Sequence, residues 1–304
     1  MTGPPGVLAE LAPDVFAYVQ ADGSWFINNT GFVVAGDGVL SIDSCATEDR
    51  TRAYLAAIRT VTARPVTTLV NTHHHPDHTN GNGLLGARVI VAHADCREQL
   101  ARVPWPPPVP VFGPVDWGQV SRDLPGICFE RRLDLHVGGR RIELLHFGTP
   151  AHTTNDIVAW LPADRVLFAG DLVFNGATPF ALSGSVAGWL DVLTALRDLG
   201  AEVIVPGHGP PGGPGLLQET AGYLEFVQKA AADTYAAGRP VPDAAAGLDL
   251  GRYAELTDAE RIVGNLYRAY AELDGRDRGC PLDEARCFAG MVAYNGGRPL
   301  RCLA

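Results

Sequence analysis

The segment NTHHHPDHTNG places four possible metal ligands within six residues: His73, His75, Asp77 and His78. It directly follows an apolar run, residues 66–70, that predicts a buried strand. Side chains at positions i and i+2 of an extended segment point to the same side, so His73 and His75 can bind one ion. The proline between the two pairs bends the chain, which turns Asp77 and His78 toward a second ion. Neutral imidazoles and a carboxylate suit Zn²⁺, and Fe²⁺ or Mn²⁺ also accept such ligands.

Three further segments each carry one candidate ligand after a predicted strand. These ligands are His152 in the sequence GTPAH, Asp171 after residues 166–169, and His208 after residues 203–205. We expect all four segments to meet at one edge of the sheets. Small neighbouring residues let the backbone come close to a pair of ions, and Asp171 is the kind of carboxylate that bridges two ions about 3.5–4 Å apart. Each residue alone is weak evidence, but together they predict a dinuclear site.

Such a site predicts hydrolytic chemistry. Between two divalent ions, water loses much of its proton affinity, and the ions polarise a substrate carbonyl. Ester-type bonds are the natural target. Asp77 is the candidate catalytic residue, because from its turn it can orient the attacking hydroxide and take up a proton. The alternative is that Asp77 serves only as a metal ligand. His74 lies between two candidate ligands and is expected to have a structural role.

The elements that must position these residues form two β-rich halves of a 304-residue chain. In the first half the patterns predict strands at 15–19, 25–34, 39–43, 66–70 and 89–91, with helices at 48–59 and 93–101. In the second half they predict strands at 133–137, 141–146, 157–161, 166–169 and 203–205, with a helix at 186–199. Two such halves favour an α/β four-layer αββα sandwich. We expect it to span residues 1–212, with a helical extension over residues 213–304 packed on it.

Composition excludes several classes of protein. The formal net charge of −10 disfavours nucleic-acid binding, because phosphates need a concentrated basic face. No run approaches the roughly 20 apolar residues of a membrane span, and the first residues do not read as a secretory signal. We therefore expect a cytoplasmic protein without a nucleic-acid or membrane partner. The six cysteines are scattered, which favours neither a disulfide framework nor a zinc ribbon.

Aromatic residues near the predicted ligands suggest a substrate pocket. A proline-rich segment, residues 103–117, is predicted to be a loop, and such long loops are often functional lids. Aromatic side chains also fill cores, so the alternative is a structural role. The candidate substrate-binding residues are Trp25, Phe26, Trp105, Phe112, Phe174, Asn175 and Phe180.

On its ligand segments the chain resembles the metallo-β-lactamase-fold metallohydrolases over about residues 15–212. This resemblance implies a first metal held by His73, His75 and His152, a second held by Asp77, His78 and His208, and Asp171 as the bridge. The best-known dizinc β-lactamases have Cys where this chain has Asp171, so a role in antibiotic resistance is not expected. Diiron relatives have Glu at the position of His75, which favours hydrolysis over oxygen reduction here.

Two stretches, DLVFNGATPFALSGSVAGWL and RCFAGMVAYNGGRPLRCLA, look like the cyclase/thioesterases of bacterial type II aromatic polyketide pathways. That resemblance implies two Zn²⁺ ions, an acyl carrier protein as partner, and aldol-type ring cyclisation with thioester hydrolysis at one site. One alternative is a glyoxalase II-like or lactonase-type hydrolase of a small soluble substrate. Another, of a different class, is a mononuclear iron persulfide dioxygenase.

Overall fold

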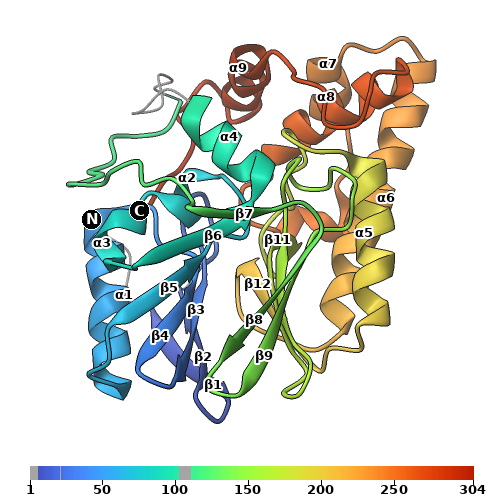
Figure 1. Cartoon of the computed structure of the whole chain (residues 1–304). Coiled ribbons are helices and arrows are strands. Elements are labelled where there is room, and N and C mark those ends of the chain that lie inside the picture. Colours follow the sequence, from blue (N-terminus) through green and yellow to red (C-terminus); the bar gives the residue numbers. More distant parts are fainter. Residues whose placement is uncertain (1–5, 21, 103–110) are drawn as a thin grey trace.

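Two β-sheets pack face to face, and helices cover the outer face of each (Figure 1). The structure is a computed structural model that describes residues 6–20, 22–102 and 111–304. This arrangement confirms the predicted four-layer αββα sandwich, including helices at the C-terminal end. Among the described helices, none has the length and apolar character needed to cross a membrane.

The first sheet follows the chain from edge to edge. Within the described residues its strands are β1 (Val7–Ala12), β2 (Val15–Val19), β3 (Thr30–Ala35), β4 (Gly38–Ile42), β5 (Val66–Val70), β6 (Val89–His93) and β7 (Ile127–Phe129). Strands β1 to β4 are antiparallel, whereas β4 to β7 are parallel. The carboxyl ends of β4, β5 and β6 therefore share one edge, which is where ligands bind in open α/β sheets.

The second sheet lies against the first. Its described strands, in spatial order, are β12 (Val203–His208), β11 (Val166–Phe174), β10 (Val158–Leu161), β9 (Arg140–Leu145) and β8 (Arg132–Val137). Only the β11–β12 pair among them is parallel, so these two strands end at the same edge as β5. Aliphatic side chains from both inner faces, such as Leu40, Val70, Leu144 and Val166, fill the space between the sheets.

Helices bury the outer faces. Helix α1 (Glu48–Val61) packs on the first sheet through Tyr54 and Ile58. Its N-terminus is capped by Thr47, whose side chain accepts a hydrogen bond from the Arg50 amide. The second sheet is covered by α5 (Val186–Asp198), α6 (Gly215–Ala236) and α8 (Arg261–Leu273), which share one apolar core with it. The domain boundary after residue 212 stays a prediction.

The remaining described helices are short or lie near one end of the sheets (Figure 1). They are α2 (Pro76–Thr79), α3 (Asn82–Leu85), α4 (Ala94–Arg102), α7 (Val241–Ala246), α9 (Glu284–Tyr294) and a 3₁₀ turn, η1 (Gly251–Glu255). The sequence patterns did not predict β1, β7, α7 or α9. Strand β7 has only three residues, which is too short for a periodic signal.

The strand predicted over 25–34 is wrong in its first half, because β3 begins at Thr30. Asn29 instead uses its backbone and side-chain amide groups to bind the segment around Gly207, so residues 25–29 form no ladder with a neighbouring strand. The strand predicted over 166–169 also differs, because β11 continues to Phe174. Asp171 therefore lies within a strand, and His208 is the last residue of β12.

Candidate metal centre

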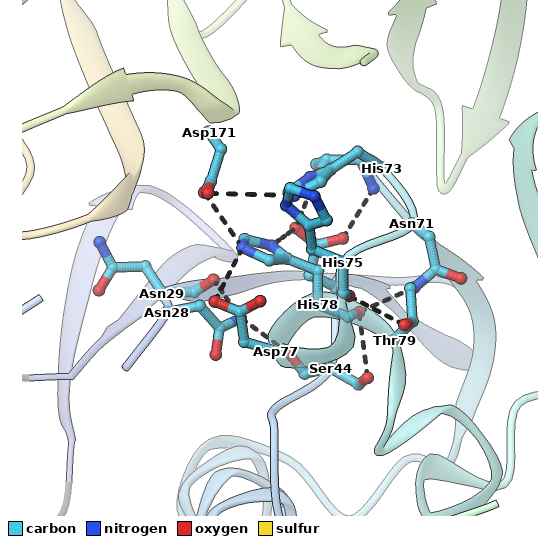
Figure 2. A network of polar contacts seen from close by, with 12 residues as sticks. Asn28, Asn29, Ser44, Asn71, His73, His75, Asp77, His78, Thr79 and Asp171 are labelled. Carbon is cyan, nitrogen blue, oxygen red and sulfur yellow. Dashed lines mark hydrogen bonds and ion pairs between the residues drawn. The ribbon is translucent and has the colours of Figure 1, made fainter. Parts of the chain in front are cut away.

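The seven predicted ligands come together at the shared edge of the sheets. His73 follows β5, and the next three candidates lie on or beside α2, a single turn that begins directly after His75. Asp171 and His208 project from the neighbouring strands β11 and β12, and His152 from the connection between β9 and β10. Figure 2 shows Asp171 approaching His73 and His78 from the opposite sheet.

The candidate ligand atoms form two groups that share one carboxylate. The first group is His73, His75, His152 and Asp171, and the second is Asp77, His78 and His208; within each group the atoms lie within 4.8 Å of one another. Asp171 Oδ2 is 3.3 Å from Nε2 of His152 and 3.4 Å from Nε2 of His208. Its Oδ1 is 3.1 Å from Nε2 of His78. The carboxylate thus lies between the two groups, as a bridging ligand must.

Poorly satisfied buried atoms indicate what this cluster is built to hold. Nε2 of His73 is buried and has no hydrogen-bond partner, and Nε2 of His78 has only the neighbouring Oδ1 of Asp171, 3.1 Å away. Poorly satisfied polar groups are costly in a protein interior, and such a cluster calls for an explanation. Imidazole nitrogens and carboxylate oxygens are suitable ligands for Zn²⁺ and related divalent ions. The residues present therefore fit a pair of metal ions.

The electrostatics of the first group agree with metal binding. Burial lowers the pKa of His73 and His75 well below the usual range, and the neighbouring imidazoles add to this effect. Burial likewise lowers the pKa of His152 to about 4. These histidines are therefore neutral near pH 7, the form that coordinates a metal. Burial by itself raises the pKa of Asp171, but the surrounding imidazoles, His208 first, bring it well below its usual range.

For His78 and His152, hydrogen bonds fix which ring nitrogen faces the centre. His78 Nδ1 lies 2.8 Å from Oδ2 of Asp43, and His152 Nδ1 lies 2.6 Å from the Phe180 carbonyl oxygen. Asp43 also accepts hydrogen bonds from the backbone amide and hydroxyl of Thr72, both at 2.7 Å. A partner on Nδ1 leaves Nε2 for the metal and orients the ring. Asp43 was missed from the sequence, although it directly follows strand β4 at the same edge.

A polar network holds the backbone that carries His78 (Figure 2). The His78 carbonyl accepts hydrogen bonds from the Ser44 amide at 3.0 Å and hydroxyl at 3.1 Å, and from the Asn71 side-chain amide at 3.0 Å. Asn82 joins Asn71 and Ser44 through its own side chain. The turn after β5 is therefore fixed by residues that follow β4 and β5 and by the first residue of α3, which restricts the position of His78.

The end of β12 is held in a similar way. The Asn29 side chain donates to the carbonyl oxygens of Pro206 at 2.9 Å and Gly209 at 2.6 Å, so it spans the segment with His208. A Cβ atom at Gly207 would lie 1.8 Å from Oδ1 of Asp171. Only glycine lets the two strands approach this closely. The expectation that small residues admit the backbone to the site is confirmed at this position.

A cavity of about 790 Å³ opens onto the candidate ligands. Five of the seven predicted substrate-binding residues line it: Trp25, Phe26, Phe112, Phe174 and Phe180. Trp105 lies outside the described residues. Asn175 is not among the residues that line this cavity, and its side-chain amide donates to the Pro210 carbonyl oxygen at 2.7 Å, in the turn after β12.

The proline-rich segment contributes to the cavity wall, whereas the part supplied by the C-terminal helices was missed by sequence reasoning. Trp117 lies in the described part of the proline-rich segment, where residues 111–115 and 117 all line the cavity. Arg261, Glu284 and Phe288 reach it from the C-terminal helices. His74 also lines the cavity, but it belongs to neither ligand group, and its Nδ1 lies 3.0 Å from the Asn155 side-chain nitrogen.

Comparisons with known proteins agree with this geometry. The chain is 25% identical over 217 residues to a linear primary-alkylsulfatase of a Pseudomonas species, covering 59% of this chain and 41% of that protein. It is 30% identical over 145 residues to a hydroxyacylglutathione hydrolase of Rhodospirillum rubrum, covering 46% of each. The chain thus spans less than half the length of either relative.

A solved structure has the same fold. The metallo-β-lactamase from Pontibacter korlensis superposes with a TM-score of 0.61 at 22% identity, covering 72% of this chain and 99% of that one. The family model described as the metallo-beta-lactamase superfamily matches residues 23–208, which include all seven candidate ligands. Since that match covers well over half of the sequence, the chain belongs to the metallo-β-lactamase superfamily.

Proposed function

We propose that this protein is a dinuclear zinc enzyme that acts on a bulky aromatic acyl thioester, with a polyketide intermediate on an acyl carrier protein as its substrate. The observation that carries the proposal is the position of the two ligand groups beneath a large cavity with aromatic walls. The reaction is thioester hydrolysis together with aldol-type ring closure. The resemblance of the two sequence stretches to polyketide cyclase/thioesterases supports the choice of substrate.

Each side chain has a defined task in this mechanism. His73, His75 and His152 would hold one ion and Asp77, His78 and His208 the other, with the Asp171 carboxylate placed between the two groups. Two divalent ions here would lower the pKa of a water molecule and polarise the substrate carbonyl. The remaining steps fall to the protein, which must place the acyl group and move a proton.

Asp77 is the proposed proton acceptor. Its Oδ2 lies 3.2 Å from Nε2 of His208, and the residue lines the cavity, so it faces both the ligand groups and the substrate. Burial alone raises the pKa of Asp77, but His78 and His208 outweigh burial and keep that pKa below its ordinary value. The carboxylate is therefore ionised near neutral pH, as a general base must be.

The cavity wall supports a large apolar substrate. Trp25 and Phe112 meet edge to face with their ring centroids 5.3 Å apart, and Trp117 packs against Phe26 at 5.2 Å. An apolar acyl group gains about 25 cal/mol for each Å² that it buries, so a fused aromatic substrate benefits from this wall far more than a short acyl group. Size selectivity is therefore the property that best tests the proposal.

A glyoxalase II-like activity is the second candidate, and the similarity to the hydroxyacylglutathione hydrolase favours it. This activity requires the same ligand groups and differs in the substrate. The aromatic wall gives no evident advantage to an anionic, hydrophilic glutathione thioester. A glyoxalase II-like enzyme would therefore prefer S-lactoylglutathione over a bulky aromatic thioester.

The decisive experiment combines metal analysis with a panel of thioesters. We expect about two zinc equivalents per chain and a kcat/KM that rises from acetyl to 2-naphthoyl N-acetylcysteamine thioesters, and rises again when the acyl group is on an acyl carrier protein. A preference for S-lactoylglutathione would instead support the second candidate. If the chain instead binds one iron and oxidises a persulfide, both candidate functions are wrong and the protein is a dioxygenase.

A further inference from the structure

Trp25 is the central ring of the aromatic wall. Its centroid lies 5.3 Å from that of Phe112, 5.0 Å from that of Phe180 and 6.4 Å from that of Phe288. The ring is carried by residues 22–29, which form no helix or strand. An irregular segment does not by itself fix the orientation of an indole, so contacts from elsewhere must do so.

Those contacts come from the start of helix α8. The indole Nε1–H of Trp25 donates a hydrogen bond of 2.8 Å to Oε1 of Glu260. The guanidinium carbon of Arg261 lies 4.0 Å from the centroid of the Trp25 ring, the geometry of a cation–π contact. One residue thus holds the edge of the indole, and the next holds its face.

Arg261 is itself a rigid support. It is 2% exposed, its Nη2 lies 2.9 Å from Oδ2 of Asp258, and its Nη1 donates to the Thr178 carbonyl oxygen at 2.8 Å. A buried cation tied to two fixed groups cannot swing away from the ring that it contacts. The position of Trp25 is therefore set by α8.

These supports lie outside the segment matched by the family model, which ends at residue 208. The same extension also contributes Glu284 and Phe288 of α9 to the cavity lining. The ligand groups thus belong to the part of the chain that the family model covers, whereas one side of the cavity is built by helices added after it. The candidate metal ligands and the residues that would select the substrate therefore lie in different parts of the chain.

We propose that Glu260 and Arg261 are positioning residues for Trp25, and that through them the C-terminal extension sets the selectivity for bulky aromatic acyl groups. This inference rests on the proposed function, since it assumes that the cavity receives the acyl group. Loss of the Glu260 contact removes the hydrogen bond that fixes the edge of the indole while Arg261 still holds its face, so the wall matches a flat fused ring less well. A small acyl group that does not reach the wall is unaffected.

The test uses Glu260→Ala in the metal-loaded full chain, with S-(2-naphthoyl)- and S-acetyl-N-acetylcysteamine as the two substrates. We expect KM for the naphthoyl thioester to rise about fivefold with kcat within about twofold, and both constants for the acetyl thioester to stay within about twofold. Glu260→Gln keeps an acceptor for the indole N–H and should restore the low KM. Glu255→Ala, an exposed carboxylate on the adjacent 3₁₀ turn, is the matched control.

A double-mutant cycle makes the test specific to Trp25. Once Trp25→Phe has removed the indole N–H, Glu260→Ala should cause no further change in KM. Binding of 2-naphthol, measured by calorimetry on the same variants, gives a readout that is independent of turnover and should weaken by the same factor. Equal losses on both substrates, or additive effects in the cycle, would overturn the inference. A wild-type chain that binds 2-naphthol but cleaves neither thioester would refute only the proposed function.

Discussion

At the scale of single residues, Asp171 is the point on which both metal sites depend. Its two oxygens approach imidazoles of both ligand groups, with distances of 3.1 Å to His78 and 3.3 Å to His152. We therefore expect Asp171→Ala to lower the metal content at both sites, from about two equivalents to well below one. Elemental analysis after gel filtration measures this. His74→Ala, which removes a neighbouring histidine outside both groups, should retain the wild-type content; equal losses in the two variants would contradict a bridging role.

Asp77 is expected to affect the reaction rate more than metal binding. Asp77→Asn keeps the shape of the side chain but removes the charge and the capacity to accept a proton, and general-base catalysis is worth about 10²–10⁴ in rate. We predict that kcat falls by at least about a hundredfold while part of the metal is retained. Steady-state kinetics at measured metal loading tests this. A rate near the wild-type value with both sites filled would show that Asp77 serves only as a ligand.

At the scale of elements, the candidate ligands near strand ends could be predicted from the sequence. The residues that support those ligands from neighbouring strands and loops could not. The residue types that follow the predicted strands 66–70, 166–169 and 203–205 were enough to identify His73, Asp171 and His208 as candidates. Asp43 escaped notice because its value depends on β4 lying beside β5, and strand order is a property of the tertiary fold. Residues 25–29 were assigned to a strand because their local apolar pattern does not reveal that Asn29 bonds to a distant segment.

The support that Asp43 gives to His78 can be measured. Asp43→Asn removes the charge 2.8 Å from Nδ1 of His78 and weakens the acceptor that orients the ring. Replacing such an outer partner usually costs about 10- to 100-fold in metal affinity. We expect a loss of this size in competition with a chromophoric chelator. Asp37→Asn, in the exposed turn between β3 and β4, should leave the affinity unchanged; an unchanged affinity in Asp43→Asn would instead make this contact dispensable.

At the scale of the whole molecule, the two β-rich halves of the sequence predicted the four-layer sandwich. They did not predict the shape of the cavity. The sequence predicted a helical extension over residues 213–304, and α6 and α8 lie within it. It gave no indication that Arg261, Glu284 and Phe288 would line the cavity, because helical periodicity identifies an apolar face without identifying what that face covers. The aromatic wall of the cavity depends on packing between segments more than 200 residues apart in the sequence. The hydrogen bond from Trp25 to Glu260 is an example.

The metal centre also joins the two sheets, so we expect metal loss to destabilise the entire fold. Ions that bind only the native state stabilise it by about 4 kcal/mol when present at 1,000 times the dissociation constant. Without them, the Asp171 carboxylate and the imidazoles around it stay buried with only one another as partners. Chelation should therefore lower Tm by several degrees in calorimetry, and added Zn²⁺ should restore it. Asp171→Ala should show a smaller response to chelation, because it has already lost the ligand common to both ions; an unchanged Tm in the wild-type chain would mean that no metal is held at this edge.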